Sequence, residues 1–166
     1  MTRVDAYAQQ VESAEDNARG IVVDWQQEWS EFVTPRFADL IIYKAHVGSF
    51  AGLHDHLNIS TYATFADFET KLRYIRELGF NARQLLPTEQ VDGIDGEGYG
   101  ATNLFAPHNG YGTPAQIRWR SLFSERDATR WQRLRFALTE RESLVDAAHR
   151  HGLAVIFDSV LLFRKQ

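Results

Sequence analysis

Histidine and acidic side chains lie close together at two places where they could bind a metal ion. In His54-Asp55-His56 the two imidazoles are two positions apart, so on a strand they would share one face. A third ligand would have to come from elsewhere, and a solvated loop is the favoured interpretation. His149 and His151 fall in the last turn of a predicted helix, where positive charge suits the helix dipole, and we assign them no ligand role.

Tyr99 lies in a glycine-rich segment from Thr88 to Gly112 that is predicted to be a long loop. An aromatic ring in a loop can stack on a sugar, because a pyranose offers C–H groups to the ring face. The same ring could instead be a packing residue. A phosphate-binding loop is disfavoured, since no Gly-Lys-Ser/Thr helix start follows the glycines.

Asp158 directly follows Leu153–Phe157, an apolar run of strand length. A carboxylate at the carboxyl end of a strand could belong to a functional site, cap a helix or lie in an ordinary loop. The residues alone leave these alternatives open.

One stretch of the chain interleaves basic and aromatic residues and could bind RNA or another polyanion through phosphate contacts and stacking. The solvated face of a helix, with its tryptophans packed inward, is the favoured interpretation. The residues concerned are Arg118, Trp119, Arg120, Arg126, Arg130, Trp131, Arg133 and Arg135.

Three apolar runs predict strands: Leu40–Tyr43, Phe80–Leu86 and Leu153–Phe157. The first is short, continuous and rich in β-branched residues, which is typical of a strand buried on both faces. Helices between the strands give the order βαβαβ, which predicts parallel strands joined by right-handed crossovers.

Helical spacing of apolar residues from Phe65 to Leu78 predicts a helix that a capping box at Thr64 begins and Gly79 ends. Further helix starts are predicted at Thr113, Ser124 and Thr139. The last of these helices is predicted to turn Leu144, Val145 and Ala148 inward and to end at Gly152.

The composition is that of a globular protein, with 44% hydrophobic and 24% charged residues and a net charge of −4. That charge predicts no attraction to nucleic acid or to an anionic membrane. No cysteine is present, so disulfides are excluded. The polar, acidic start is no secretory signal, and no segment is apolar enough to span a membrane. We expect a cytoplasmic protein, or a plastid protein if the source is eukaryotic.

Four stretches taken together resemble glycoside hydrolase family 13, the α-amylase and branching-enzyme family. The segment from Ile42 to Phe50 resembles the "YExHVGxF" signature of its first barrel strand. The segment from Lys71 to Pro87 is similar to its first helix and second strand. Gly98 to Pro114 resembles the loop "WGYDxxxxFAPxxxYGTP", and Leu144 to Asp158 resembles its third strand with the preceding helix.

The resemblance implies an α/β fold, a partial TIM (β/α)8 barrel made of the first three parallel strands with their covering helices. It implies a lead-in segment at residues 1–38, a truncated catalytic barrel at residues 39–166, and α-1,4-linked glucan as substrate. By this alignment Tyr99 is the ring that stacks on the sugar beside the scissile bond. Asp158 lies at the mouth of the site and orients neighbouring groups.

The family's nucleophile, acid/base and third carboxylate follow its fourth, fifth and seventh strands, so we expect no catalytic residue and no turnover from this chain. The alternative is a non-catalytic module that binds glucan or a polyanion.

Several positions depart from the family pattern. Lys44 replaces the glutamate of the first signature, and Glu97 and Gly100 replace the tryptophan and aspartate of "WGYD". Leu162 and Phe163 replace the asparagine and histidine of "DxxxNH", so a ligand on the calcium side is lost and no cofactor is expected. These departures, with an insertion between Pro114 and Thr139, suggest an incomplete or mis-spliced gene product. Three strands of eight would leave open edges, from which we expect marginal stability or self-association.

Overall fold

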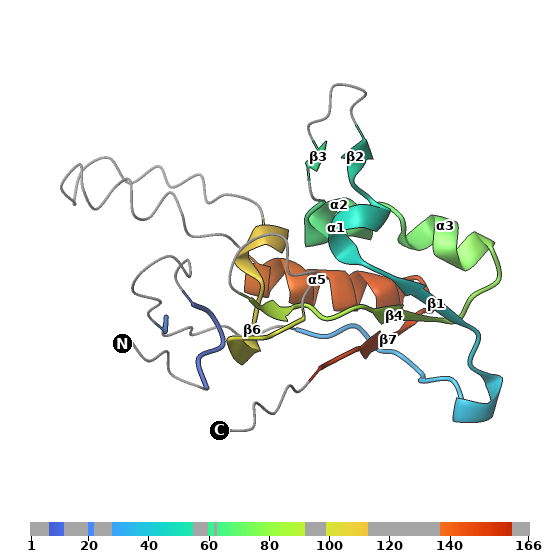
Figure 1. The fold of residues 1–166 in the computed structure, drawn as a ribbon. Helices are drawn as coiled ribbons and strands as arrows, with labels where there is room; N and C mark the ends of the chain where they lie inside the picture. The colour runs from blue at the N-terminus through green and yellow to red at the C-terminus, as the bar shows by residue number, and fades with distance from the viewer. Residues whose placement is uncertain are drawn as a thin grey trace, which may run out of the picture.

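The computed structural model of the chain describes residues 7–11, 20–21, 28–54, 60–61, 63–91, 99–112 and 137–160 (Figure 1). Its centre is a parallel sheet in the order β1-β4-β7, formed by Ile42–Ala45, Ala82–Leu85 and Ala154–Phe157. Lys44 pairs with Gln84, which pairs with Ile156, so the three strands run in register. The predicted parallel βαβαβ sheet is confirmed.

Among the described residues, four α-helices accompany the sheet: α1 (Val47–Phe50), α2 (Phe65–Glu69), α3 (Leu72–Glu77) and α5 (Ala137–Arg150). α2 packs on α5, and both cover the same face of the sheet (Figure 1). The core between these layers consists of Ala45, Val47, Phe65, Phe68, Leu72, Ile75, Leu85, Tyr111, Leu144, Ala147, Ala148 and Leu153.

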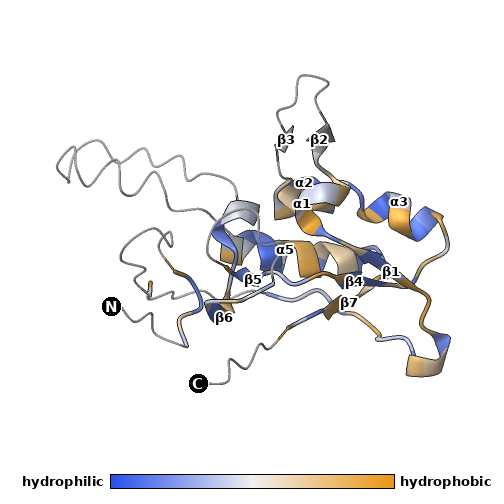
Figure 2. Ribbon diagram, in the orientation of Figure 1, coloured by the Kyte–Doolittle hydropathy of each residue, from blue (hydrophilic) through white to orange (hydrophobic). Residues whose placement is uncertain are grey.

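The predicted helix from Phe65 to Leu78 is two helices. It begins as expected, since Thr64 Oγ1 accepts from the Asp67 N–H at 3.2 Å and Asp67 Oδ2 accepts from the Thr64 N–H at 2.8 Å. α2 then ends at Glu69, where the Thr70 hydroxyl donates to the Asp67 carbonyl at 2.6 Å. α3 follows with alternating hydrophobic and hydrophilic bands (Figure 2). The end at Gly79 is confirmed, because this glycine has a φ of +96°.

The helix α5 also differs from its prediction. Its described part begins at Ala137, so Thr139 lies inside the helix and does not cap it. Leu144 and Ala148 are fully buried as predicted, whereas Val145 is only half-buried. Gly152, with a φ of +70°, ends the turn after the helix as expected.

The predicted burial of the first strand on both faces is wrong. Ile41 is 56% exposed and Ile42, at the start of β1, is 41% exposed. The described sheet pairs β1 on one side only, with β4, so β1 is an edge strand. An edge strand has a neighbouring strand on one side only, so its side chains are less buried than those of a central strand.

The predicted loop from Thr88 to Gly112 contains ordered structure. β5 (Glu89–Gln90) and β6 (Asn103–Pro107) pair antiparallel, and the 3₁₀ helix η2 (Asn109–Tyr111) follows. β5 has only two residues, both polar, and β6 has no alternation of apolar and polar residues, which is why the sequence pattern missed them. A second small pair joins β2 (Leu53–His54) to β3 (Ser60–Thr61), which puts His54 in a strand where a loop was favoured.

The segment before β1 lies along α5 and includes the 3₁₀ helix η1 (Phe37–Asp39). The backbone N–H of Ser30 donates to Asp146 Oδ1 at 2.7 Å, and this bond lowers the pKa of the buried Asp146 carboxyl. The Phe32 ring stacks on His149 with centroids 4.3 Å apart, and burial lowers the pKa of that imidazole. The His149 ring therefore packs α5 against the segment before β1.

Several sequence predictions lie outside the described residues. They are the helix starts at Thr113 and Ser124, the basic stretch from Arg118 to Arg135, the side chains of Asp55 and His56, and Leu162 and Phe163. The division into residues 1–38 and 39–166 is not tested by the described structure and stays a prediction.

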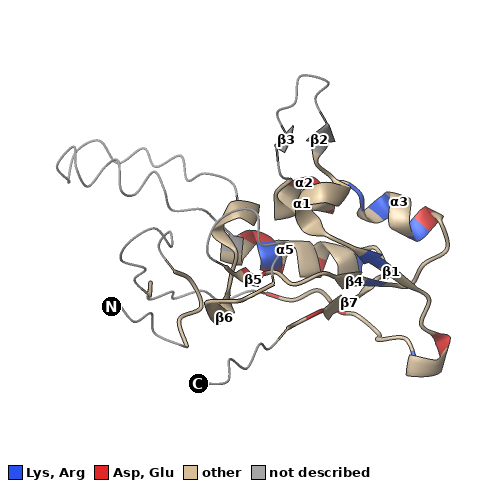
Figure 3. Ribbon diagram, in the orientation of Figure 1, with Lys and Arg blue, Asp and Glu red and all other residues tan. Residues whose placement is uncertain are grey.

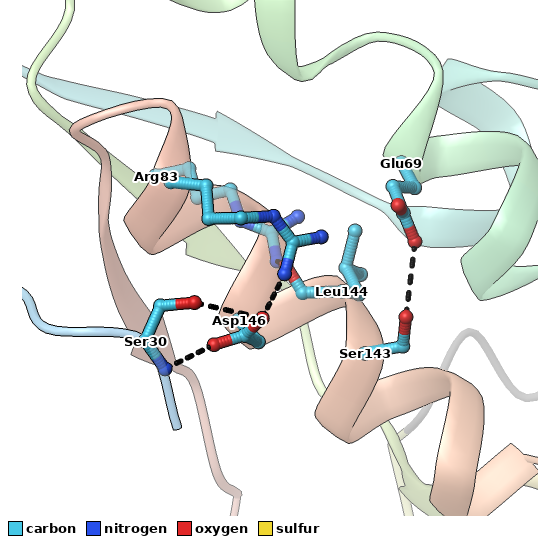
Figure 4. A network of polar contacts seen from close by, with 7 residues as sticks. Ser30, Glu69, Arg83, Ser143, Leu144 and Asp146 are labelled. Carbon is cyan, nitrogen blue, oxygen red and sulfur yellow. Dashed lines mark hydrogen bonds and ion pairs between the residues drawn. The ribbon is translucent and has the colours of Figure 1, made fainter. Parts of the chain in front are cut away.

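Arg83, in the central strand β4, is fully buried between the sheet and the helices. Its guanidinium carbon lies 5.0 Å from the centre of the Phe68 ring, and Nη2 donates to the Leu144 carbonyl at 3.4 Å (Figure 4). Nε and Nη1 have no hydrogen-bond partner among the described residues. Burial lowers the pKa of Arg83 to about 9, although the charge of Glu69 opposes the shift. The folded state therefore carries a guanidinium that burial disfavours.

We predict that Arg83→Met stabilises the chain by about 1–3 kcal/mol, because an apolar side chain of similar length removes a poorly satisfied buried charge. The charge penalty is complete below the lowered pKa and fades above it, so the gain should shrink at about pH 10. Urea unfolding at both pH values measures this. The matched control is Arg73→Met on the exposed side of α3, where we expect a change within about 0.5 kcal/mol. A loss of stability on Arg83→Met at neutral pH would contradict the prediction.

Candidate functional site

Three polar side chains meet where the parallel strands end. Lys44 Nζ of β1 lies 3.1 Å from Asp158 Oδ2, and Gln84 Nε2 of β4 donates to the same oxygen at 3.3 Å. Residues 44 and 84 are register partners, and residue 158 lies two positions beyond the partner Ile156. All three therefore point to the face opposite the helices, since side chains alternate along a strand. Basic residues lie within both β1 and β4 in Figure 3.

The backbone fixes Asp158. Its N–H donates to the Leu85 carbonyl at 2.9 Å, which extends the β4–β7 ladder by one step past β7. Leu86 likewise donates to the Ala45 carbonyl at 3.0 Å. The Asp158 side chain is 26% exposed, and the contacts with Lys44 and Gln84 both fall on Oδ2. None of the hydrogen bonds among the described residues falls on Oδ1.

His46, at the end of β1, joins the strand to the loop that follows β6. Nδ1 accepts from the Ser49 N–H at 3.2 Å and so caps α1. A neutral imidazole whose Nδ1 accepts carries its proton on Nε2, which donates to the Tyr111 hydroxyl at 2.7 Å. Tyr111 also meets the rings of Phe65 and His108 edge-on. The imidazole is therefore a structural link between β1 and η2.

Sequence reasoning assigned no role to His46, Tyr111 or Gln84, although all three lie in the segments that resemble the family. A polar residue immediately after a predicted strand was the available signal for His46. Nothing local could pair it with Tyr111, which lies 65 positions away.

Tyr99 lies on the link from β5 to β6, and β5 follows the carboxyl end of the parallel strand β4. Gly100 follows it with a φ of +85°, a left-handed turn that other residues rarely adopt. Beyond the turn, the Thr102 N–H donates to the Gln90 carbonyl at 2.8 Å. The ring is 46% exposed. A fixed turn thus presents an aromatic face to solvent.

The hairpin that carries Tyr99 is held by buried amide side chains. Gln90 Oε1 accepts from the Asn109 N–H at 2.9 Å, and Asn103 Oδ1 accepts from the N–H groups of Phe105 and Ala106 at 2.9 and 2.7 Å. These bonds satisfy backbone groups that so short a ladder leaves unpaired. The Gln90 bond ties η2 to β5, and the Asn103 bonds lie within β6.

No hydrogen bond joins the two predicted site residues, Tyr99 and Asp158. Asp158 is gathered with Lys44 and Gln84, whereas Tyr99 stands on the hairpin. Such an arrangement can stack a ring on an apolar face and offer a carboxylate oxygen to a hydroxyl group. Within the described ranges, no three His, Cys, Asp or Glu residues are grouped to hold a metal ion, and none of the described helices is long and apolar enough to cross a membrane.

Known proteins with similar sequences act on α-glucans or on related sugars. No family model matches the chain. The malto-oligosyltrehalose trehalohydrolase of Saccharolobus solfataricus is 31% identical over 137 residues, which are 82% of this chain and 18% of that protein. The chloroplastic or amyloplastic 1,4-alpha-glucan-branching enzyme 2-2 of Arabidopsis thaliana is 32% identical over 121 residues, 73% of this chain and 11% of the enzyme. The chain spans about a fifth of the length of the curated relatives it matches first.

Solved structures share the fold at lower sequence identity. The catalytic module of a glycogen-degrading pneumococcal virulence factor matches 93% of this chain with a TM-score of 0.70 and 20% identity, over 25% of its own length. The type I pullulanase of Bacillus subtilis matches 93% of this chain with a TM-score of 0.68 and 21% identity, over 22% of its length. With three parallel strands in sequential order and these relatives, the chain belongs to glycoside hydrolase family 13, the α-amylase family, and matches the first strands of its catalytic (β/α)8 barrel.

Proposed function

We propose that the chain forms one wall of a cleft that binds α-1,4-linked glucan, with Tyr99 as the stacking ring. The single observation that supports this is the half-exposed Tyr99 ring, held by the Gly100 turn on a hairpin at the carboxyl ends of the parallel strands. Barrel enzymes build their sites at these strand ends. Similar proteins include branching enzymes and isoamylase, and solved pullulanases were crystallised with maltose and maltotetraose.

Asp158 is the proposed polar group of this wall. Lys44 and Gln84 hold its Oδ2, so Oδ1 is directed to accept from a sugar hydroxyl. In this proposal Asp158 orients the sugar and neighbouring groups and takes no part in bond cleavage. Lys44, in place of the family's glutamate, balances the Asp158 charge with an ion pair that is half exposed and therefore weak.

We propose that these 166 residues bind glucan without cleaving it. A retaining mechanism needs two carboxyl groups about 5–5.5 Å apart, one as nucleophile and one as acid/base. In the family these groups follow the fourth and fifth strands, and the described sheet contributes three. No cofactor is proposed, and the position of the family's calcium-side ligand, Leu162, carries a hydrocarbon side chain.

Purified chain is expected to release no reducing sugar from starch or maltooligosaccharides beyond a buffer blank. The physical reason is the missing pair of carboxylates. A reducing-end assay over several hours measures this, with a related α-amylase as positive control. Hydrolysis that rises in proportion to chain concentration and persists after repurification would refute the proposal that turnover needs further strands.

Tyr99→Ala is expected to weaken the binding of maltooligosaccharides by about tenfold, because the stacking face is removed. Tyr99→Phe keeps the ring and should bind within about twofold of the unchanged chain. Calorimetric titration measures both affinities. Tyr74→Ala on α3, which removes a tyrosine of similar exposure far from the hairpin, is the matched control. Equal binding by all four proteins would remove Tyr99 from the site.

The open edges of the sheet should make the chain associate, since Ile41, Ile42 and Phe157 leave apolar surface exposed at the two outer strands. We expect concentration-dependent sedimentation and binding of an apolar dye. Ile42→Lys places a charge on the edge strand β1 and should weaken association by about tenfold. Val33→Lys, at a residue that is 91% exposed outside the sheet, is the control and should change little. A monomeric chain with a cooperative melt and no dye binding would contradict this.

A further inference from the structure

A second aromatic surface lies on the far strand of the same hairpin. The rings of Tyr7 and Phe105 stack with centroids 5.6 Å apart and planes 25° apart. Tyr7 is 78% exposed and Phe105 is 50% exposed, so each ring keeps its outer face and part of its edge open to solvent. We call these two residues the outer platform.

The outer platform is held in place by packing and by a long-range hydrogen bond. Ala8 and Val11 form a small buried cluster with Ala106 of β6. Asn109 Nδ2, buried in η2, donates to the Val11 carbonyl at 2.7 Å. The segment of residues 7–11 runs beside β6 in Figure 1. Tyr7 is therefore brought to Phe105 by contacts that do not involve the rings themselves.

The size and chemistry of the outer platform fit a sugar better than a protein. Two aromatic side chains together can cover at most about 300–500 Å², and these rings are partly covered already. A stable protein interface needs about 800 Å² on each partner. A flat ring face with a phenol at its edge offers stacking to pyranose C–H groups and one hydrogen bond to a hydroxyl.

The outer platform is also within reach of a chain bound at Tyr99. Phe105 is six positions beyond Tyr99, so their Cα atoms are separated by at most about 20 Å. Gly100 and the Thr102 anchor bend the chain between them, which shortens that separation. A maltooligosaccharide of several glucose units can span such a distance, whereas maltose cannot.

We propose that Tyr7 and Phe105 form a second sugar-stacking site, which binds a further glucose unit of the α-glucan chain held at Tyr99. This inference rests on the proposed function and extends it: the wall has two stacking positions and so favours long glucan chains over short ones. The reach from Tyr99 to the outer platform sets the minimum length that gains affinity.

The test compares maltoheptaose with maltose by calorimetric titration of the full chain. Tyr7→Ala should weaken maltoheptaose binding by about fivefold and leave maltose binding unchanged. Tyr7→Phe keeps the ring and should bind both sugars within about twofold of the unchanged chain. Phe105→Ala, with its fold checked by circular dichroism, should match Tyr7→Ala. Tyr74→Ala on α3 is the control for loss of an exposed tyrosine.

The outcomes separate the outer platform from the proposed function. If Tyr99→Ala weakens both sugars and Tyr7→Ala weakens neither, the outer platform is wrong and the Tyr99 site stands. If the unchanged chain binds neither sugar, the proposed function fails and the outer platform with it. If Tyr7→Ala abolishes self-association without changing sugar affinity, the rings contact protein and the inference is overturned.

Discussion

Side chains that alternate along strands in register decide which residues of this chain meet. Tyr43, Arg83 and Val155 are register partners and face the helices, as do Ala45, Leu85 and Phe157 two positions on. The residues between them face the opposite side, where no described helix covers the sheet. One of these two alternating sets of strand residues therefore forms the core, and the other set contributes to the proposed site. A slip of one residue in any strand would exchange the two.

This constraint explains the two basic residues in the sheet. Lys44 lies on the open side, where its ammonium reaches Asp158 and keeps contact with water. Arg83 lies on the helix side, where the Phe68 ring covers its guanidinium. Among the described residues, its hydrogen bond goes to the Leu144 carbonyl (Figure 4). Glu69 is near enough to oppose the pKa shift, but its Oε2 accepts from the Ser143 hydroxyl at 3.4 Å. The two cations lie on opposite faces of the sheet and therefore differ in their effect on stability. Lys44 is weakly stabilising, whereas buried Arg83 lowers stability.

The sequence predicted what local chemistry determines. The capping box at Thr64, the left-handed glycines 79 and 152 and the three apolar runs correspond to observed features, and Asp158 lies where its run ends. It missed features that depend on partners far along the chain. The β5–β6 pair depends on buried Gln90 and Asn103, and the His46–Tyr111 bond joins residues 65 positions apart. The burial of Arg83 could not be predicted, because it depends on the register between strands, which the sequence of one strand does not reveal. The exposure of Ile42 could not be predicted without knowing which strands lie at the edge of the sheet.

Binding and cleavage make different demands on a barrel, and this difference bears on how one wall can function. A stacking ring needs one support, which for the proposed ring Tyr99 is a hairpin with buried amides and a left-handed turn. Its energy falls gradually as the sugar shifts, because contact with a ring face has little directionality. Paired carboxylates must instead be held within about 0.5 Å by separate strands whose spacing is set when the barrel closes. Removing strands therefore destroys the geometry of cleavage before it destroys a stacking surface. On this argument, glucan affinity can persist in a part of the fold where turnover has no structural basis.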